Sequence, residues 1–410
     1  MKHRRKKGKG RKHPVAIAMV LVLSFLLTGG LWYLKKSIPD QLNVASLSDV
    51  DSIELPFNSM IKDEVVYASA GAENTKIPAD QIRIQCSFLG IVPLKTVEIQ
   101  QKVLPEVYTG GDTIGIFMKT QGVLAVGTGI VNGADGQKSE PALGIVQSGD
   151  YITKINGQMV SSKQEVIDAV NQSAGTDIQI TVLRGENEKN GTLTPVLTEE
   201  GDYKVGIWVR EDTQGIGTLT YVDQMKKYGA LGHGISDVDT GELLKIRSGT
   251  LYRASVQAVK KGEKGNPGEL SGVIYYQDDQ ILGDITENGE TGIKGTLKKV
   301  PDEQKHSLLP VAYRQDVREG AACIRCSIDG EIKEYRVVIE KINFSHRDVN
   351  KSMVIRVTDE ELLEKTGGIV QGMSGSPIIQ DDRLIGAVTH VFIADPSRGY
   401  AIFAENMIEG

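Results

Sequence analysis

The stretch GGIVQGMSGSP, residues 367–377, places Ser374 in a glycine-rich turn directly before the apolar pair Ile378 and Ile379. A serine hydroxyl is a poor nucleophile in water. It becomes reactive where a sharp turn presents its oxygen to a base and aims backbone N–H groups at the developing oxyanion. The flanking glycines admit backbone geometry that a side chain would forbid. The stretch therefore predicts acyl-transfer chemistry at Ser374, and the alternative is a glycine-serine hairpin between two strands.

The order Gly-x-Ser-Gly-x-Pro is also that of the nucleophile loop in chymotrypsin-like peptidases. In that loop the N–H groups of the serine and of the residue two positions before it line the oxyanion hole. By this similarity the oxyanion hole is formed by Gly372 and Ser374.

A serine nucleophile needs a base that is neutral near pH 7, and histidine is the natural supplier. His233 lies between two glycines in LGHGISD, in a turn that leaves its ring accessible. It precedes Ser374, as the histidine does in chymotrypsin-type peptidases. The other histidines are His3, His13, His306, His346 and His390. The first two precede the apolar run described below, the next two lie in polar surroundings, and the last ends an apolar strand where packing is expected.

A third residue must orient the imidazole and stabilise its charged form. Asp359 lies fifteen residues before Ser374 and is the candidate. Asp237 and Asp239 are alternatives, although they are very close to His233 in sequence.

The N-terminus differs in charge from the rest of the chain. Residues 1–13 contain eight Lys or Arg and no acid, although the net charge of the 410 residues is −6. Residues 14–34 carry no charge over about 21 residues, which is long enough to cross a bilayer as a helix. We therefore expect a basic cytoplasmic leader, a transmembrane anchor over 14–34 and export of the remainder. A cleaved signal peptide is the alternative, and the acidic remainder argues against a nucleic-acid partner.

Residues 35–94 mix polar residues with a few prolines and predict a juxtamembrane linker with one short strand near 52–55. An exposed segment of this kind is where proteolytic nicking is expected.

Residues 95–200 resemble a PDZ domain, most specifically in SGDYITKINGQ at 148–158. A capping box at Ser162 and Glu165 opens a helix after this stretch. The resemblance implies that a peptide adds as a strand between a glycine-rich loop and this helix. The implied groove residues are Gly111, Ile114, Gly115, Ile116, Val166 and Val170. The alternative is a small αβ domain without a ligand.

After Tyr203 many short strands are separated by Gly, Asp and Asn turns, which indicates a barrel or a pair of barrels over 201–410. The expected fold is mainly β with a small α+β domain. It comprises an anchor helix, a PDZ domain and a trypsin-like double β-barrel peptidase domain.

Three cysteines, Cys86, Cys323 and Cys326, allow at most one disulfide. Cys323 and Cys326 have C-x-x-C spacing, but they lie in an alternating strand pattern. A zinc site would need a second ligand pair. We expect two incidental strand cysteines, no metal and no cofactor.

The chain resembles the stage IV sporulation protein B family of serine peptidases. The most specific matches are ALGHGISDVDTG at 230–241, GGIVQGMSGSPIIQ at 367–380 and GAVTHVFIADPSRGYAIF at 386–403. The resemblance implies that His233 is the general base, Ser374 the nucleophile and Asp359 the acid partner.

The resemblance also implies a biological setting. The protein would be made in the developing spore and exported across its inner membrane into the space between the two forespore membranes. It would cut itself before the PDZ domain and be released. It would then cut a regulatory subunit of the intramembrane protease complex that activates the mother-cell sigma factor. The PDZ ligand could be its own chain.

Two other functions compete with this one. A non-catalytic PDZ scaffold would recruit partners, but it has no reason to keep both His233 and Ser374 in glycine-rich turns. A thiol-redox role for Cys323 and Cys326 is a more distant alternative.

Overall fold

The computed structural model describes residues 13–47, 61–67, 82–299, 302, 305–344 and 348–410. The chain divides into two compact units, one made of residues 1–103, 313–316 and 343–347, and one made of the rest. Residues 1–12 of the expected leader and the strand expected near 52–55 lie outside the described residues.

The first unit contains a helix and a four-stranded sheet. Its elements are α1 (His13–Ser37), β1 (Gln41–Val44), β2 (Ile61–Tyr67), β3 (Ile82–Phe88) and β4 (Val92–Gln101). The strand order is β1-β4-β3-β2, with β1 parallel to β4 and the other pairs antiparallel. A core that includes Leu34, Ile38, Ile84, Val97 and Ile99 packs against the sheet. We expected a linker over 35–94, but the described parts of this segment form strands of the sheet. Their alternating apolar residues are buried in one common core.

Helix α1 covers the whole of the charge-free run, and its side chains such as Leu23 and Phe25 are exposed. Judged on the described residues alone, none of the helices is long and apolar enough to span a bilayer. The anchor over 14–34 remains a prediction from the sequence.

The second unit carries most of the strands. The first group is β5 (Glu106–Thr109), β6 (Thr113–Thr128), β7 (Val131–Asn132), β8 (Lys138–Ser139), β9 (Tyr151–Ile155), β10 (Gln158–Met159), α2 (Lys163–Gln172), β11 (Ile178–Arg184), β12 (Asn187–Leu193), β13 (Val196–Leu197) and β14 (Tyr203–Lys204). The second group is β15 (Ile207–Asp223), β16 (Lys227–Ala230), β17 (Ile246–Lys260), β18 (Glu269–Ile274), η2 (Asp278–Gln280), β19 (Ile281–Gly289), β20 (Gly292–Leu297) and β21 (Leu308–Pro310). The third group is η3 (Arg314–Asp316, in the first unit), β22 (Gly320–Ser327), β23 (Ile332–Ile342), η4 (Val349–Lys351), β24 (Met353–Val357), α3 (Glu360–Thr366), β25 (Pro377–Gln380), β26 (Arg383–Val391), β27 (Arg398–Phe403) and α4 (Ala404–Glu409).

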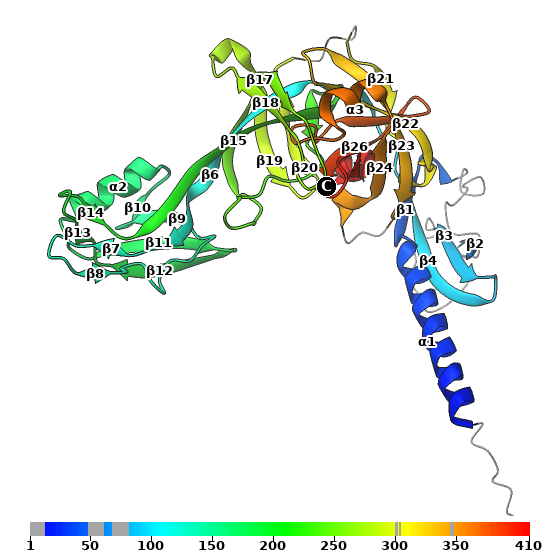
Figure 1. The fold of residues 1–410 in the computed structure, drawn as a ribbon, viewed down its shortest axis with the longest axis horizontal. Coiled ribbons are helices and arrows are strands. Elements are labelled where there is room, and N and C mark those ends of the chain that lie inside the picture. Colours follow the sequence, from blue (N-terminus) through cyan, green and yellow to red (C-terminus); the bar gives the residue numbers. More distant parts are fainter. Residues whose placement is uncertain (1–12, 48–60, 68–81, 300–301, 303–304, 345–347) are drawn as a thin grey trace, which may run out of the picture. The chain divides into compact units, whose positions relative to one another are not determined.

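Two rings of strands are formed. In the first ring β6, β17, β19, β20, β16 and β15 pair in that order, and an additional pairing of β15 with β6 closes it. The second ring is the closed barrel β22-β23-β24-β27-β26-β25 (Figure 1). Buried residues such as Ile114, Ile116 and Leu251 fill the first ring. The predicted pair of barrels is present.

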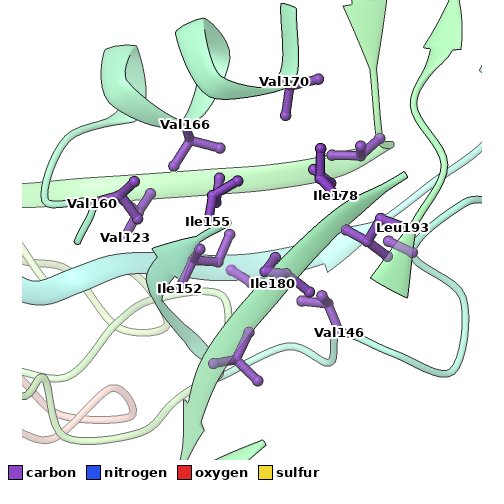
Figure 2. Packing of buried hydrophobic residues seen from close by; sticks show 14 residues of the cluster. Val123, Val146, Ile152, Ile155, Val160, Val166, Val170, Ile178, Ile180 and Leu193 are labelled. Atoms are coloured by element: carbon purple, nitrogen blue, oxygen red, sulfur yellow. The ribbon is translucent and has the colours of Figure 1, made fainter. Parts of the chain in front are cut away.

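A small domain is inserted into the first ring rather than preceding it. Strand β6 leaves the ring at its C-terminal half, and β15 returns to the ring after its N-terminal half. Between them lie β9, β11, β12 and α2 around their own core. In Figure 2 Val166 and Val170 point from α2 toward Val160, Ile155 and Ile178 of this core.

Two boundaries differ from those expected. Residues 95–101 belong to β4 of the first unit, and the first half of β6 belongs to the peptidase ring. The core of the inserted domain runs from Val123 to Val209. Sequence order could not show this arrangement, because β6 is one continuous 16-residue strand shared by two cores.

Candidate active site

Ser374 lies in the loop between α3 and β25, and this loop is fastened to β26. The N–H of Gly375 donates to Val388 O at 2.8 Å, and the N–H of Val388 donates to Ser376 O at 3.0 Å. Gly375 has a φ of +94°, and a Cβ there would stand 2.5 Å from the nitrogen of Leu231. Only glycine fits such a position, which explains the residue that follows Ser374.

The hydroxyl of Ser374 donates to Thr389 O at 2.8 Å. The pairing of β26 with β27 shifts register between Val388 and His390, and the accepting carbonyl lies within that shift. A carbonyl oxygen does not remove a proton at neutral pH. The serine therefore has to rotate about its side-chain bond before a base can activate it.

The N–H groups of Gly372 and Ser374 have no hydrogen-bond partner among the described residues. Gly372 has a φ of +98°, and the carbonyl before it, that of Gln371, is held by the N–H of Leu270 at 2.8 Å. Two neighbouring unpaired N–H groups in a fixed loop have the character of an oxyanion hole. The structure thus leaves both predicted donors available.

His233 follows β16 of the first ring, and its ring is half-buried. Its Nδ1 lies 2.9 Å from Gly234 O. A carbonyl can only accept, so Nδ1 carries the proton and Nε2 keeps a free lone pair. Burial lowers the pKa of His233, while the bond to Gly234 opposes that shift. The ring is therefore neutral at pH 7 in the tautomer that a general base needs.

His390 packs against His233, with ring centroids 4.8 Å apart and ring planes at 34°. Desolvation, followed by the nearness of His233 and Lys351, lowers the pKa of His390 to about 4. The sequence indicated only a packing role for this residue. Its contact is with the candidate base itself, and the family-matching stretch 386–403 that contains His390 did not indicate this contact.

The structure brings the serine and the histidine together across the two rings. A Cβ on Gly232 would lie 3.1 Å from Cγ2 of Thr389, the residue whose carbonyl receives the Ser374 hydroxyl. His233 comes from the first ring, and Ser374 comes from the loop that enters the second. Their hydrogen bond is not formed among the described residues, since each has the partner given above.

The third predicted member, Asp359, is placed elsewhere. It is the N-cap of α3, where Oδ1 accepts from the N–H groups of Glu361 at 3.1 Å and Leu362 at 3.2 Å. Its Oδ2 accepts from the backbone N–H of Arg336 at 3.3 Å and faces Nε of the same residue at 3.5 Å. Desolvation raises the pKa of this carboxyl, but the hydrogen bonds from Leu362 and Arg336 outweigh it, so that the pKa is lowered.

The position of Asp359 along β24 also separates it from the histidines. Asp359 follows the C-terminal end of β24. Tyr400 of β27 pairs with Val354 near the N-terminal end of β24 on one side and with His390 of β26 on the other. His390 therefore lies level with the opposite end of β24. The described contacts of Asp359 are those of a helix cap. Its role as acid partner stays a prediction.

The two alternative aspartates organise a turn. Asp237 is buried, pairs with Arg210 and accepts from the N–H groups of Asp239 and Thr240 at 3.0 Å. Asp239 pairs with the same arginine at 2.8 Å. In the described part of the chain the partner of His233 Nδ1 is the Gly234 carbonyl rather than a carboxylate.

The predicted peptide groove needs a correction. Ile114 and Ile116 are buried in the core of the first ring, and a Cβ on Gly115 would meet Ile274 at 2.6 Å. A Cβ on Gly111 would meet Ile332 at 2.9 Å, on the side of the second ring. These four residues therefore belong to the peptidase rings, because the first half of β6 pairs with β15 and β17.

The cavity of the inserted domain lies instead between α2 and the start of β15. It has a volume of about 560 Å³ and is lined by Val166, Val170, Gly206, Ile207, Trp208 and Val209, among others. Gly206 has a φ of +66°, and a Cβ there would stand 2.3 Å from Gly129 O. A glycine followed by an apolar strand occurs at both 111 and 206, so this signal alone does not distinguish the two.

These elements define a two-barrel fold with a small αβ domain inserted and a candidate serine-peptidase site. The model of the SpoIVB peptidase S55 family matches residues 201–408. The chain belongs to this family, and it is a serine endopeptidase.

Solved structures show similar parts. The PDZ domain of the SdrC-like protein from Listeria monocytogenes is 24% identical over 22% of this chain and 87% of its own, with a TM-score of 0.19. The corresponding domain from Listeria innocua is 26% identical over 21% and 94%, with a TM-score of 0.17. The protease Rv3671c from M. tuberculosis in its active form is 14% identical over 48% and 72%, with a TM-score of 0.26. No curated protein matches the chain.

Proposed function

We propose that this serine endopeptidase is exported across the inner forespore membrane, cuts its own chain ahead of the inserted domain, and then cuts a regulatory membrane protein. That second cut would allow an intramembrane protease complex to activate the mother-cell sigma factor. Family membership and the family resemblance of the motifs support this assignment.

One observation carries the catalytic part of the proposal. Ser374 lies in a loop in which the N–H groups of Gly372 and Ser374 have no partner among the described residues, near the segment of a neutral histidine. Within the same residues, Nε2 of His233 has no hydrogen-bond partner and can accept a proton. Attack on a peptide carbonyl would put the oxyanion at Gly372 and Ser374 while His233 takes the hydroxyl proton. The residues require no metal or cofactor for this chemistry.

The self-cleavage site is proposed to lie within 35–94 but outside the strands of the first unit. A peptidase needs an extended, accessible backbone, and β1, β2, β3 and β4 already pair theirs in a sheet. The anchor over 14–34 and the cytoplasmic leader are part of the proposal on sequence grounds, because a basic stretch is followed by a charge-free run.

The cavity beside α2 supports peptide binding as a second activity of the same protein. Its apolar wall and exposed edge suit an extended segment that adds as a strand, and the ligand would be a segment of this chain or of the substrate. Family membership favours an enzyme over a non-catalytic scaffold.

The test is self-processing of the full chain in detergent, as wild type and as Ser374→Ala, followed by intact mass. We expect the wild type alone to lose an N-terminal fragment, and the mass gives the cleaved bond. Adding wild type to a tagged Ser374→Ala chain shows whether one molecule can cut another. Equal processing of both chains would refute Ser374 as the nucleophile.

A further inference from the structure

Thr218 of β15 is buried, at 2% exposure, and it contacts the nucleophile loop twice. Its N–H donates to Ser374 O at 3.0 Å. Its hydroxyl donates to Gly372 O at 3.0 Å. One residue therefore holds the carbonyls of both residues whose N–H groups form the oxyanion hole.

Those two carbonyls determine how the loop presents its N–H groups. The peptide unit is planar, so the N–H of Gly372 turns with the carbonyl of Gln371, and its angle to the carbonyl of Gly372 is set by the backbone torsion at Gly372. The N–H of Leu270 holds the first carbonyl and the hydroxyl of Thr218 holds the second, and together they fix that torsion. Gly372, at a φ of +98°, has no side chain to restrict this torsion, and an unheld peptide after it could turn over. The Thr218 hydroxyl supplies the restraint that Gly372 lacks.

Thr218 also contacts the segment that carries the histidine. Its own carbonyl accepts from the N–H of Leu231 at 3.3 Å, and Leu231 stands two residues before His233. The same residue thus links the loop of the nucleophile to the segment of the base, which come from different rings.

We propose that Thr218 is a positioning residue that holds the oxyanion hole open and in register with His233. The inference rests on the proposed assignment of Ser374, Gly372 and His233. The side-chain hydroxyl is the specific part, because any residue would supply the N–H and the carbonyl at this position.

Thr220, two residues along the same strand, offers a matched control. It is fully buried, and its hydroxyl donates to Gly375 O at 2.8 Å. The carbonyl of Gly375 belongs to neither residue that supplies an oxyanion N–H. Replacing Thr220 by valine removes a hydroxyl-to-carbonyl hydrogen bond from the same strand, but it leaves the carbonyls of Gly372 and Ser374 held by Thr218.

The experiment uses the full chain and an alkyl fluorophosphonate, read by intact mass. The serine oxygen attacks phosphorus, fluoride leaves, the base takes the proton, and the phosphoryl oxygen occupies the oxyanion hole. The variants are Thr218→Val, Thr218→Ser, Thr220→Val and Ser374→Ala. Thermal unfolding of each variant is measured beside its labelling rate.

We expect Thr218→Val to slow labelling by at least about tenfold, and by no more than the roughly 10²–10³-fold typical of losing a whole oxyanion donor. Thr218→Ser should restore the rate to within about threefold, since it restores the hydroxyl donor. Thr220→Val should unfold at a temperature similar to Thr218→Val and still label at close to the wild-type rate. If Thr218→Val does not fold, Thr218→Ala against Thr220→Ala makes the same comparison.

Labelling of Thr218→Val at the wild-type rate would overturn the proposal, as would equal slowing of both valine variants. Failure of the underlying assignment has a different signature. Labelling of Ser374→Ala, or no labelling of the wild type, would refute the nucleophile and with it the positioning role.

Discussion

The cavity of the inserted domain and the proposed catalytic centre are assembled in different ways. The cavity lies between one helix and the start of one strand, both within a small domain that has its own core. The catalytic centre draws His233 from one ring of strands and Ser374 from the loop that enters another. The comparison shows that a motif can nominate candidate side chains even when distant elements hold them, whereas the position of a groove depends on which strands pair.

Strand β15 belongs to both regions. Its first residues, Ile207–Val209, line the cavity, and Thr218 near its end holds the carbonyls of the two proposed oxyanion-hole residues. Substitutions in the two regions should therefore separate cleanly, with effects on rate at one end and on stability or peptide binding at the other.

The largest effect is expected at the base. His233→Phe should lower the fluorophosphonate labelling rate by about 10⁴-fold, because the serine then has no proton acceptor. The control is Met225→Ala, since Met225 is exposed in the turn between β15 and β16. Labelling of His233→Phe at the control rate would show that His233 is not the base.

The corrected groove is tested by stability. Ile114 is fully buried in the first ring, so Ile114→Ala should lower the free energy of unfolding by about 2–5 kcal/mol. Trp208 lines the cavity with 71% of its surface exposed, so Trp208→Ala should change it by less than about 0.5 kcal/mol. Urea unfolding measures both. If Ile114→Ala changed the free energy of unfolding as little as Trp208→Ala does, Ile114 would not be a core residue and could again be a groove residue.

The contacts of Asp359 make a smaller prediction. Asp359→Ala should cost about 1 kcal/mol of stability through loss of the cap on α3, while Asp359→Asn keeps the cap and costs little. The exposed pair with Arg336 adds little to either value. Labelling rates are measured on the same variants. A loss of about 10⁴-fold in Asp359→Asn would show that the carboxylate reaches His233 in the reacting state.

The smallest expected effect concerns pH. A base works only while neutral, and a neutral histidine is lost as the pH falls through its pKa. Burial lowers the pKa of His233 from its ordinary 6.5, so labelling should persist below pH 6.5. His390→Ala uncovers the ring and should move this acid limb upward toward 6.5. An acid limb at or above 6.5 in the wild type would contradict the burial argument.

The sequence by itself determined the nucleophile loop, the candidate base and the predominance of β structure. These follow from local requirements, because a reactive serine needs glycines around it and alternating residues need a pleated strand. The same local logic predicted the capping box at Ser162 that begins α2.

Only the tertiary structure decided which strand borders the groove, that the small domain is inserted in a ring, and that Thr218 and His390 contact the site. β6 and β15 each have apolar residues toward both ends and a polar stretch in the middle, and such patterns indicate burial without identifying the partner strand. β6 pairs with β15, about ninety residues further along the chain. Because of this pairing, one half of each strand packs in the core of the first ring and the other half in the core of the inserted domain. The roles of these residues are set by their neighbours in space, and a single sequence does not contain that information in local form.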